Sequence, residues 1–132
     1  MIVKKIKAAF EDERGKITDI IEHTPVDSVT IITCLNGAIR ANHYHKESVQ
    51  YSYVLSGQML AYAQMPGEAV ESQILEEGDM MESPPFERHA LHALEDSVLL
   101  IVTRGPRGGK NYENDTFRVP KITHDINKLT KK

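Results

Sequence analysis

Short runs in which apolar and polar residues alternate cover most of the chain, and turn residues separate them. "QYSYVLS" and "QMLAYAQ" are two such runs, and Ser56-Gly57 joins them. Alternation of this kind indicates strands with one buried face. The pattern predicts strands over residues 2–6, 16–22, 28–35, 38–45, 50–56, 58–64, 70–76, 79–83, 89–94 and 97–104. Strands spaced about ten residues apart are typical of an all-β sandwich or barrel.

The same alternation predicts which side chains fill the interior of such a barrel. We expect these residues around a site or between the sheets: Ile31, Thr33, Ser52, Val54, Leu60, Tyr62, Leu91, Leu99 and Ile101. Among them, Tyr62 is a candidate to bind a substrate.

The C-terminal quarter of the chain has a different pattern. Residues 104–117 are rich in glycine, charge and asparagine, which predicts an arm that crosses to a neighbouring subunit or a loop that holds an anion. Ile122, Ile126 and Leu129 follow at spacings of four and three, which predicts a short helix over 122–132.

Length and composition narrow the class of protein. The 132 residues predict a single domain over 1–132, with its core at about 28–104 and a C-terminal arm and short helix over 105–132. The net charge of −3 gives no global attraction to nucleic acid or to an anionic membrane, and no apolar run approaches the ~20 residues that span a bilayer. The basic N-terminus lacks the features of a signal peptide, and Cys34 is the only cysteine. We therefore expect a cytoplasmic protein.

Two histidines in "GAIRANHYHK" are the first candidates for chemistry. His43 and His45 are two residues apart, so on a strand they project from the same face and can hold one metal ion at about 2.0–2.2 Å. His89 opens a later strand, after Pro84-Pro85. A lone histidine on an inward face is commonly structural, but three with ordered spacing favour a site.

These residues and their spacing resemble two motifs of the cupin family. The first motif is matched by Gly37, His43, His45, Gln50 where the family has glutamate, and Gly57. The second is matched by Gly78, Pro84, Phe86 where glycine is usual, His89, and Ala93 where asparagine is usual. The resemblance spans roughly residues 28–104 and implies an all-β, double-stranded β-helix (jelly-roll) barrel.

The resemblance also implies a divalent metal ion, such as Zn, Ni, Fe or Mn, bound by His43, His45, Gln50 and His89. Glutamine offers a neutral oxygen, which is a weaker ligand than a carboxylate and leaves the full charge of the metal for an anionic substrate. Some metal-free cupins use the same histidines as general acid and base, and this alternative stays open.

A looser resemblance links the chain to cupins that act on sugar nucleotides, namely 3,5-epimerases and 3,4-ketoisomerases of deoxy sugars. It rests on Phe10, Asp12 or Glu13, Arg14 and Gly15 near the N-terminus, and on the run from Arg40 to His45. This resemblance implies that Arg40 binds phosphate oxygens of a substrate. Strand parity, however, points Arg40 away from His43 unless a β-bulge intervenes.

The leading hypothesis is a metal-dependent isomerase or epimerase that acts on a small oxygenated, sugar-like substrate, with catalytic roles for His43, His45 and His89. A dioxygenase with a three-histidine iron site and a non-catalytic cupin that binds or senses a small ligand are the alternatives. Three acidic residues near the motifs, Glu47, Glu82 and Glu87, have no assigned place. The resemblance also implies a homodimer.

Overall fold

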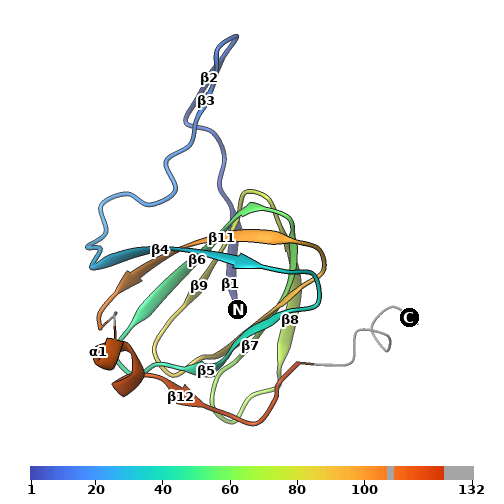
Figure 1. Cartoon of the computed structure of the whole chain (residues 1–132). Helices are drawn as coiled ribbons and strands as arrows, with labels where there is room; N and C mark the ends of the chain where they lie inside the picture. The colour runs from blue at the N-terminus through green and yellow to red at the C-terminus, as the bar shows by residue number, and fades with distance from the viewer. Residues whose placement is uncertain (107–108, 124–132) are drawn as a thin grey trace.

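The strands form two five-stranded antiparallel sheets that face each other and close into a barrel (Figure 1), in a computed structural model that describes residues 1–106 and 109–123. In spatial order, the first sheet contains β1 (Ile2–Lys5), β9 (Asp79–Ser83), β6 (Val49–Ser56), β11 (Ser97–Arg104) and β4 (Ser28–Cys34). The second contains β12 (Phe117–Arg118), β5 (Ile39–Tyr44), β10 (Arg88–Ala93), β7 (Gln58–Gln64) and β8 (Glu71–Glu76). The predicted all-β jelly-roll fold is confirmed.

A hairpin of β2 (Phe10–Asp12) and β3 (Gly15–Ile17) projects away from the barrel (Figure 1). The predicted strand over 16–22 is therefore wrong beyond Ile17. The hairpin turn is closed locally, because Asp12 accepts hydrogen bonds from the backbone and the guanidinium of Arg14. Residues 18–27 form no strand despite their apolar alternation, although residues 19–24 line a pocket together with residues of β1, β6 and β9.

The interior between the sheets is apolar over most of its length. Its buried cluster contains Cys34, Val54, Met59, Ala61, Leu75, Met81, Leu91, Ala93, Leu99 and Ile101. The expected interior positions at Val54, Leu91, Leu99 and Ile101 are confirmed. The expectation for Ile31 and Thr33 is wrong, because both are exposed. Ile32 and Cys34 face inward on β4, so the alternate residues must face outward.

A second apolar cluster covers the outer face of the second sheet. It contains Leu60, Tyr62, Ala90 and Ile122, with Val70, Leu94 and Val119 packed against them. Both faces of β7 are therefore buried, one against the interior and the other under the segment that follows β12. Leu60 and Tyr62 belong to this outer layer and not to the barrel interior.

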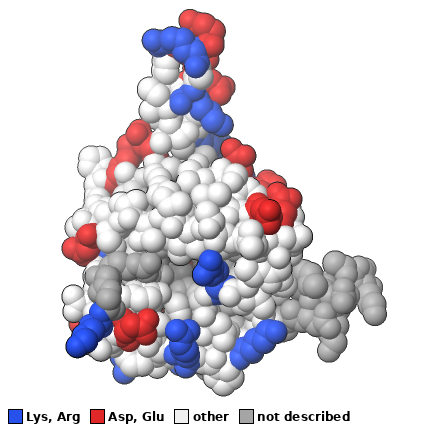
Figure 2. Space-filling model, viewed as in Figure 1, with Lys and Arg blue, Asp and Glu red and all other residues white. Residues whose placement is uncertain are grey.

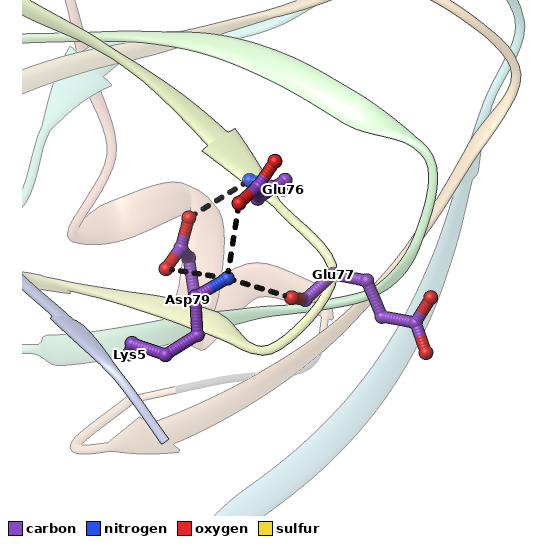
Figure 3. A network of polar contacts seen from close by, with 4 residues as sticks. All are labelled: Lys5, Glu76, Glu77 and Asp79. Carbon is purple, nitrogen blue, oxygen red and sulfur yellow. Dashed lines mark hydrogen bonds and ion pairs between the residues drawn. The ribbon is translucent and has the colours of Figure 1, made fainter. Parts of the chain in front are cut away.

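The first strand is attached to the β8–β9 turn by Lys5 (Figure 3). Its Nζ donates to the carbonyl of Glu77 at 2.9 Å and forms ion pairs with Asp79 at 3.2 Å and Glu76 at 3.5 Å. Asp79 in turn accepts the backbone N–H of Glu76. One lysine thus holds the turn and the edge strand together.

The segment predicted as a crossing arm folds back onto its own barrel. It forms the short helix α1 (Gly109–Asn114) and then β12, which pairs with β5 through Phe117 and Tyr44. A short helix therefore follows the barrel, but it begins earlier than expected. The predicted helix over 122–132 lies outside the described residues from 124 onward. No helix in the described ranges has the length and apolarity that crossing a bilayer requires.

Candidate functional site

Three histidines converge inside one end of the barrel. His43 lies on β5, His45 follows it directly, and His89 lies on β10, where it pairs with His43 across the two strands. The ring centroids are 4.7, 4.8 and 5.5 Å apart, and one nitrogen from each ring lies within 4.8 Å of the other two. All three side chains are buried. The structure therefore brings together the histidines that the sequence predicted.

A β-bulge in β5 decides which neighbours share this face. His89 pairs with His43 and Ala90 pairs with Ala41, so Asn42 is an extra residue. Ala41 and Asn42 have φ of 67° and 64°, the left-handed region that asparagine tolerates better than most residues. The Asn42 side chain stabilises the bulge by donating to Val119 O and accepting from Ile122 N.

The bulge turns Arg40 toward the cavity. Arg40 pairs with Leu91, which faces inward, and both line the same cavity as His43. Simple strand parity gave the opposite direction, because it did not count Asn42 as an extra residue. The Arg40 guanidinium donates to Thr33 O at 2.9 Å and remains exposed at its outer side. A cation therefore lines the same cavity as His43 and His89.

The cavity has a volume of about 200 Å³ and a mixed lining. Its polar lining residues are Arg40, His43, Gln50, Ser52, His89 and Tyr112. Its apolar lining residues are Ile32, Ala41, Leu91, Leu99 and Ile101. Polar groups gathered at one end of an apolar pocket are typical of small-molecule sites.

Gln50 lies between two buried hydroxyls on the neighbouring strands. It pairs with Ser83 on β9 and with Thr103 on β11, and directly paired residues project to the same face. The Oγ of Ser83 and the Oγ1 of Thr103 are buried and have no hydrogen-bond partner among the described residues. Buried hydroxyls ordinarily have a partner, and the register places the side chain of Gln50 on the same face as both.

Two of the histidines bond to main-chain carbonyls through Nδ1. His45 Nδ1 lies 2.7 Å from Asp115 O, and His89 Nδ1 lies 3.3 Å from Glu87 O. A carbonyl oxygen only accepts, so these Nδ1 atoms carry the hydrogen in neutral rings. Nε2 of each ring is then the atom with a lone pair for a metal or a proton. The Nε2 of His89 has no hydrogen-bond partner in the described residues.

Electrostatics keep His89 neutral. Burial lowers the pKa of His89 to about 4, and the nearby His45 contributes in the same direction. The ring is therefore uncharged near pH 7, which is the state that either a metal ligand or a general base requires.

Phe86 occupies the motif position where the family usually has glycine. Its φ is 72°, a conformation that costs a bulky residue of order 1–3 kcal/mol. Its N–H donates to His45 O at 2.7 Å, and its carbonyl accepts from Arg88. This loop conformation links His45 to the start of the strand that carries His89.

The structure does not bring every predicted residue to the cavity. Tyr62, expected to bind a substrate, pairs with Ala90 in the outer apolar cluster, on the opposite face of the sheet from His89, and does not line the cavity. Glu47, Glu82 and Glu87 do not line the cavity. Glu87 is nevertheless buried, and burial raises the pKa of its carboxyl.

Tyr112 and Asp115 are site residues that the sequence pattern did not predict. Tyr112 lines the cavity, with its ring centroid 5.5 Å from that of His45 and 6.4 Å from that of His43. Asp115 is buried beside the turn after His45. Burial would raise the pKa of this carboxyl, but hydrogen bonds from Lys46, Ser48 and Glu47 outweigh it and lower the pKa.

Comparison with known proteins gave a family match and a set of similar folds. The family model described as "Cupin domain" matches residues 30–103. A dTDP-4-dehydrorhamnose 3,5-epimerase from Sulfolobus tokodaii is 21% identical, with a TM-score of 0.73 over 86% of this chain and 73% of that one. The comparison with curated protein sequences gave no significant match.

Two sugar ketoisomerases have similar structures. The 3,4-ketoisomerase QdtA from Thermoanaerobacterium thermosaccharolyticum, solved with TDP, is 21% identical, with a TM-score of 0.74 over 89% of this chain and 87% of that one. WlaRA, a TDP-fucose-3,4-ketoisomerase from Campylobacter jejuni, is 15% identical, with a TM-score of 0.73 over 88% and 87%. Identities at this level show a shared fold.

A prediction on pH follows from the buried His89. Its pKa is about 4 in the folded protein against 6.5 ordinarily, so the unfolded chain binds more protons between these values. Through this residue, the free energy of unfolding of the chelator-treated protein should fall by about 3 kcal/mol from pH 7 to pH 4. Denaturant titrations at both pH values measure it. In a His89→Gln variant the free energy of unfolding should fall less between the two pH values. An equal fall in both proteins would contradict the low pKa of His89.

Proposed function

The chain belongs to the cupin family, and we propose that His43, His45, Gln50 and His89 hold a divalent metal ion for the isomerisation or epimerisation of a small, sugar-like substrate. The observation that carries the proposal is the convergence of three buried imidazoles, each offering a nitrogen within 4.8 Å of the others. Burying three imidazoles costs free energy unless both nitrogens of each ring find a hydrogen-bond or metal partner.

The donor set fits a metal such as Zn, Ni, Fe or Mn. Imidazole suits all of these ions, and an amide oxygen is an acceptable fourth ligand. The main-chain bonds at Nδ1 of His45 and His89 leave Nε2 as the donor atom, an arrangement common among metal-binding histidines. Ser83 and Thr103 can accept the amide hydrogens of Gln50, which would leave its oxygen for the metal.

A bound metal would act as a Lewis acid that polarises a substrate carbonyl. The chain supplies the remaining functions. Arg40 binds an anionic or oxygen-rich end of the substrate at the cavity mouth, and the apolar lining excludes water from the reacting carbon. Tyr112 lines the cavity beside His43 and His45, where its phenol can give and take the proton that moves between carbons.

Similar folds support a sugar-like substrate. The similar structures include a 3,5-epimerase and 3,4-ketoisomerases, enzymes whose reactions move a proton next to a carbonyl. A cavity of about 200 Å³ suits a small molecule, with Arg40 placed to contact any larger anionic extension outside. In this proposal the cavity holds the sugar-like part of the substrate, and Arg40 binds its anionic part.

A metal-free mechanism is the second candidate. The hydrogen bond from His45 Nδ1 to Asp115 O fixes the orientation of the His45 ring, as a general base requires. The low pKa of His89 keeps the His89 ring neutral. A three-histidine iron dioxygenase and a non-catalytic, ligand-binding cupin remain outcomes of the activity assay below.

We also infer that the protein forms a homodimer through the side of the barrel that carries the hairpin. On β4, Val29, Ile31 and Leu35 at its end are 60%, 58% and 74% exposed, and β4 is an edge strand. The projecting hairpin exposes Phe10 and Ile17. Figure 2 shows the barrel surface below the hairpin as largely uncharged. Apolar patches on the hairpin and the barrel of one chain suit a second copy, which can bury both symmetrically.

The metal proposal predicts a large effect of the motif histidines. The purified protein should bind about one divalent ion per chain, and a His43→Ala, His45→Ala variant should bind it at least ~100-fold more weakly, since two ligands are lost. Elemental analysis and competition with a chelator measure this. His92→Ala, on the opposite face of β10, is the matched control and should bind like the parent.

The same proteins test the function. Metal-loaded parent should interconvert keto sugars or their nucleotide derivatives, or exchange their α-hydrogens in D₂O, and the double variant should not. Turnover that survives complete metal removal would favour the metal-free mechanism. Oxygen uptake without isomerisation would favour the dioxygenase, and substrate binding without turnover would favour the non-catalytic alternative.

The metal proposal also predicts that the substitution Gln50→Glu strengthens metal binding. A carboxylate in place of the amide oxygen adds a charged ligand, so the affinity for metal should rise by about ten-fold, or about 1.4 kcal/mol. Isothermal titration with Mn²⁺ or Zn²⁺ measures it. Gln58→Glu, on β7 and outside the cavity lining, is the control. An unchanged affinity in Gln50→Glu would exclude residue 50 as a ligand.

The dimer can be tested on β4. Ile31→Lys should convert a dimer into a monomer, because it places a charge in the proposed apolar contact. Sedimentation velocity at micromolar concentration measures the mass. Ile74→Lys, at an exposed position on β8 of the other sheet, should leave the dimer intact. A monomeric parent, or a dimeric Ile31→Lys variant, would contradict this interface.

A further inference from the structure

Asp115 joins the segment after the barrel to the turn that follows the histidine motif. Its carboxylate accepts hydrogen bonds from three successive backbone N–H groups, those of Lys46 at 2.9 Å, Glu47 at 3.1 Å and Ser48 at 3.0 Å. The hydroxyl of Ser48 donates to the same carboxylate at 2.9 Å. A carboxylate has acceptor sites for all four donors, whereas an amide has one acceptor oxygen.

The main chain of the same residue contacts the site. Asp115 O accepts the Nδ1–H of His45 at 2.7 Å, and this bond is buried. The side chain of Asp115 therefore holds the turn directly after His45, and its carbonyl holds the ring of His45. Movement of Asp115 would alter the backbone path and the ring orientation together.

The anchor also fixes the helix that carries Tyr112. The N–H of Asp115 donates to Tyr112 O at 3.1 Å, and the hydroxyl of Thr116 donates to the same carbonyl at 2.6 Å. Downstream, β12 pairs with β5 opposite His43 and Tyr44. Asp115 thus lies between α1 and β12, at the point where the chain after the barrel closes one side of the cavity.

We propose that Asp115 is a positioning residue that selects the Nδ1–H tautomer of His45 and so leaves Nε2 without a hydrogen. The carboxylate does not contact the imidazole. It acts by holding the turn and its own carbonyl in place. The link to metal affinity rests on the proposed function, but the tautomer of His45 does not depend on a metal being bound.

The experiment compares the metal-free parent with Asp115→Asn and Asp27→Asn. Asp27 is the matched control, because its carboxylate also accepts a backbone N–H, that of Gly105 at 2.6 Å, without a hydrogen bond to a histidine. Long-range ¹H–¹⁵N spectra report which ring nitrogen carries the hydrogen, and a His45→Gln variant assigns the His45 signals.

The parent and Asp27→Asn should show His45 with hydrogen on Nδ1. Asp115→Asn should show a mixture of tautomers or the Nε2–H form, with Zn²⁺ affinity reduced about 10- to 100-fold, the range found for residues that orient metal ligands. Asp115→Glu, which keeps the charge, should recover part of the parental signal. Circular dichroism and thermal melts identify any variant that fails to fold, and Ser48→Ala then replaces it as a milder loss of the same anchor.

An Asp115→Asn or Ser48→Ala protein that is folded and keeps the parental His45 tautomer would overturn the proposal. A parent that shows the Nδ1–H tautomer but binds no metal would instead refute the metal-dependent function and leave the role of Asp115 intact. The two failures are therefore distinguishable in one set of samples.

Discussion

The candidate site depends on the pairing of β5 with β10 around a two-residue bulge. This pairing places His43 directly opposite His89, and the extra residue at Asn42 then reverses the direction of everything before it on β5. Without the bulge, Arg40 would face solvent on the outer side of the sheet. With it, one short strand supplies both an imidazole deep in the cavity and a guanidinium at its mouth. The strained conformations of Ala41 and Asn42 are held by bonds from Asn42 to the segment that follows β12.

That segment has more influence on the site than its composition indicates. Between Tyr112 and Ile122, the chain lines the cavity, caps the turn after His45, extends the second sheet and covers its outer face. The hydrogen bonds to the turn after His45, to its ring and to Asn42 join residues 67 to 80 positions apart in the sequence. Residues late in the sequence thus complete the end of the barrel that holds the histidines, and one of them, Asp115, also orients His45.

The sequence predicted most of the strands and the shared face of His43 and His45 from local periodicity, and the convergence with His89 from the resemblance to the cupin motifs. Alternation defines a strand, and a spacing of two places His43 and His45 on one face. It failed at Tyr62 because both faces of β7 are apolar and buried, so alternation does not show which face is the interior. It left the direction of Arg40 open, because no glycine marks the bulge that decides it. Asp115 had no local signal, since all its partners are distant in sequence.

The most direct test of the account is X-ray absorption spectroscopy of the protein loaded with one equivalent of Zn²⁺ or Mn²⁺. The structure predicts about three imidazole nitrogens at roughly 2.0–2.2 Å with one or more oxygen ligands completing the coordination. A spectrum with oxygen ligands alone, or with a single imidazole, would show that the three buried histidines do not act together on a metal and would contradict the central claim.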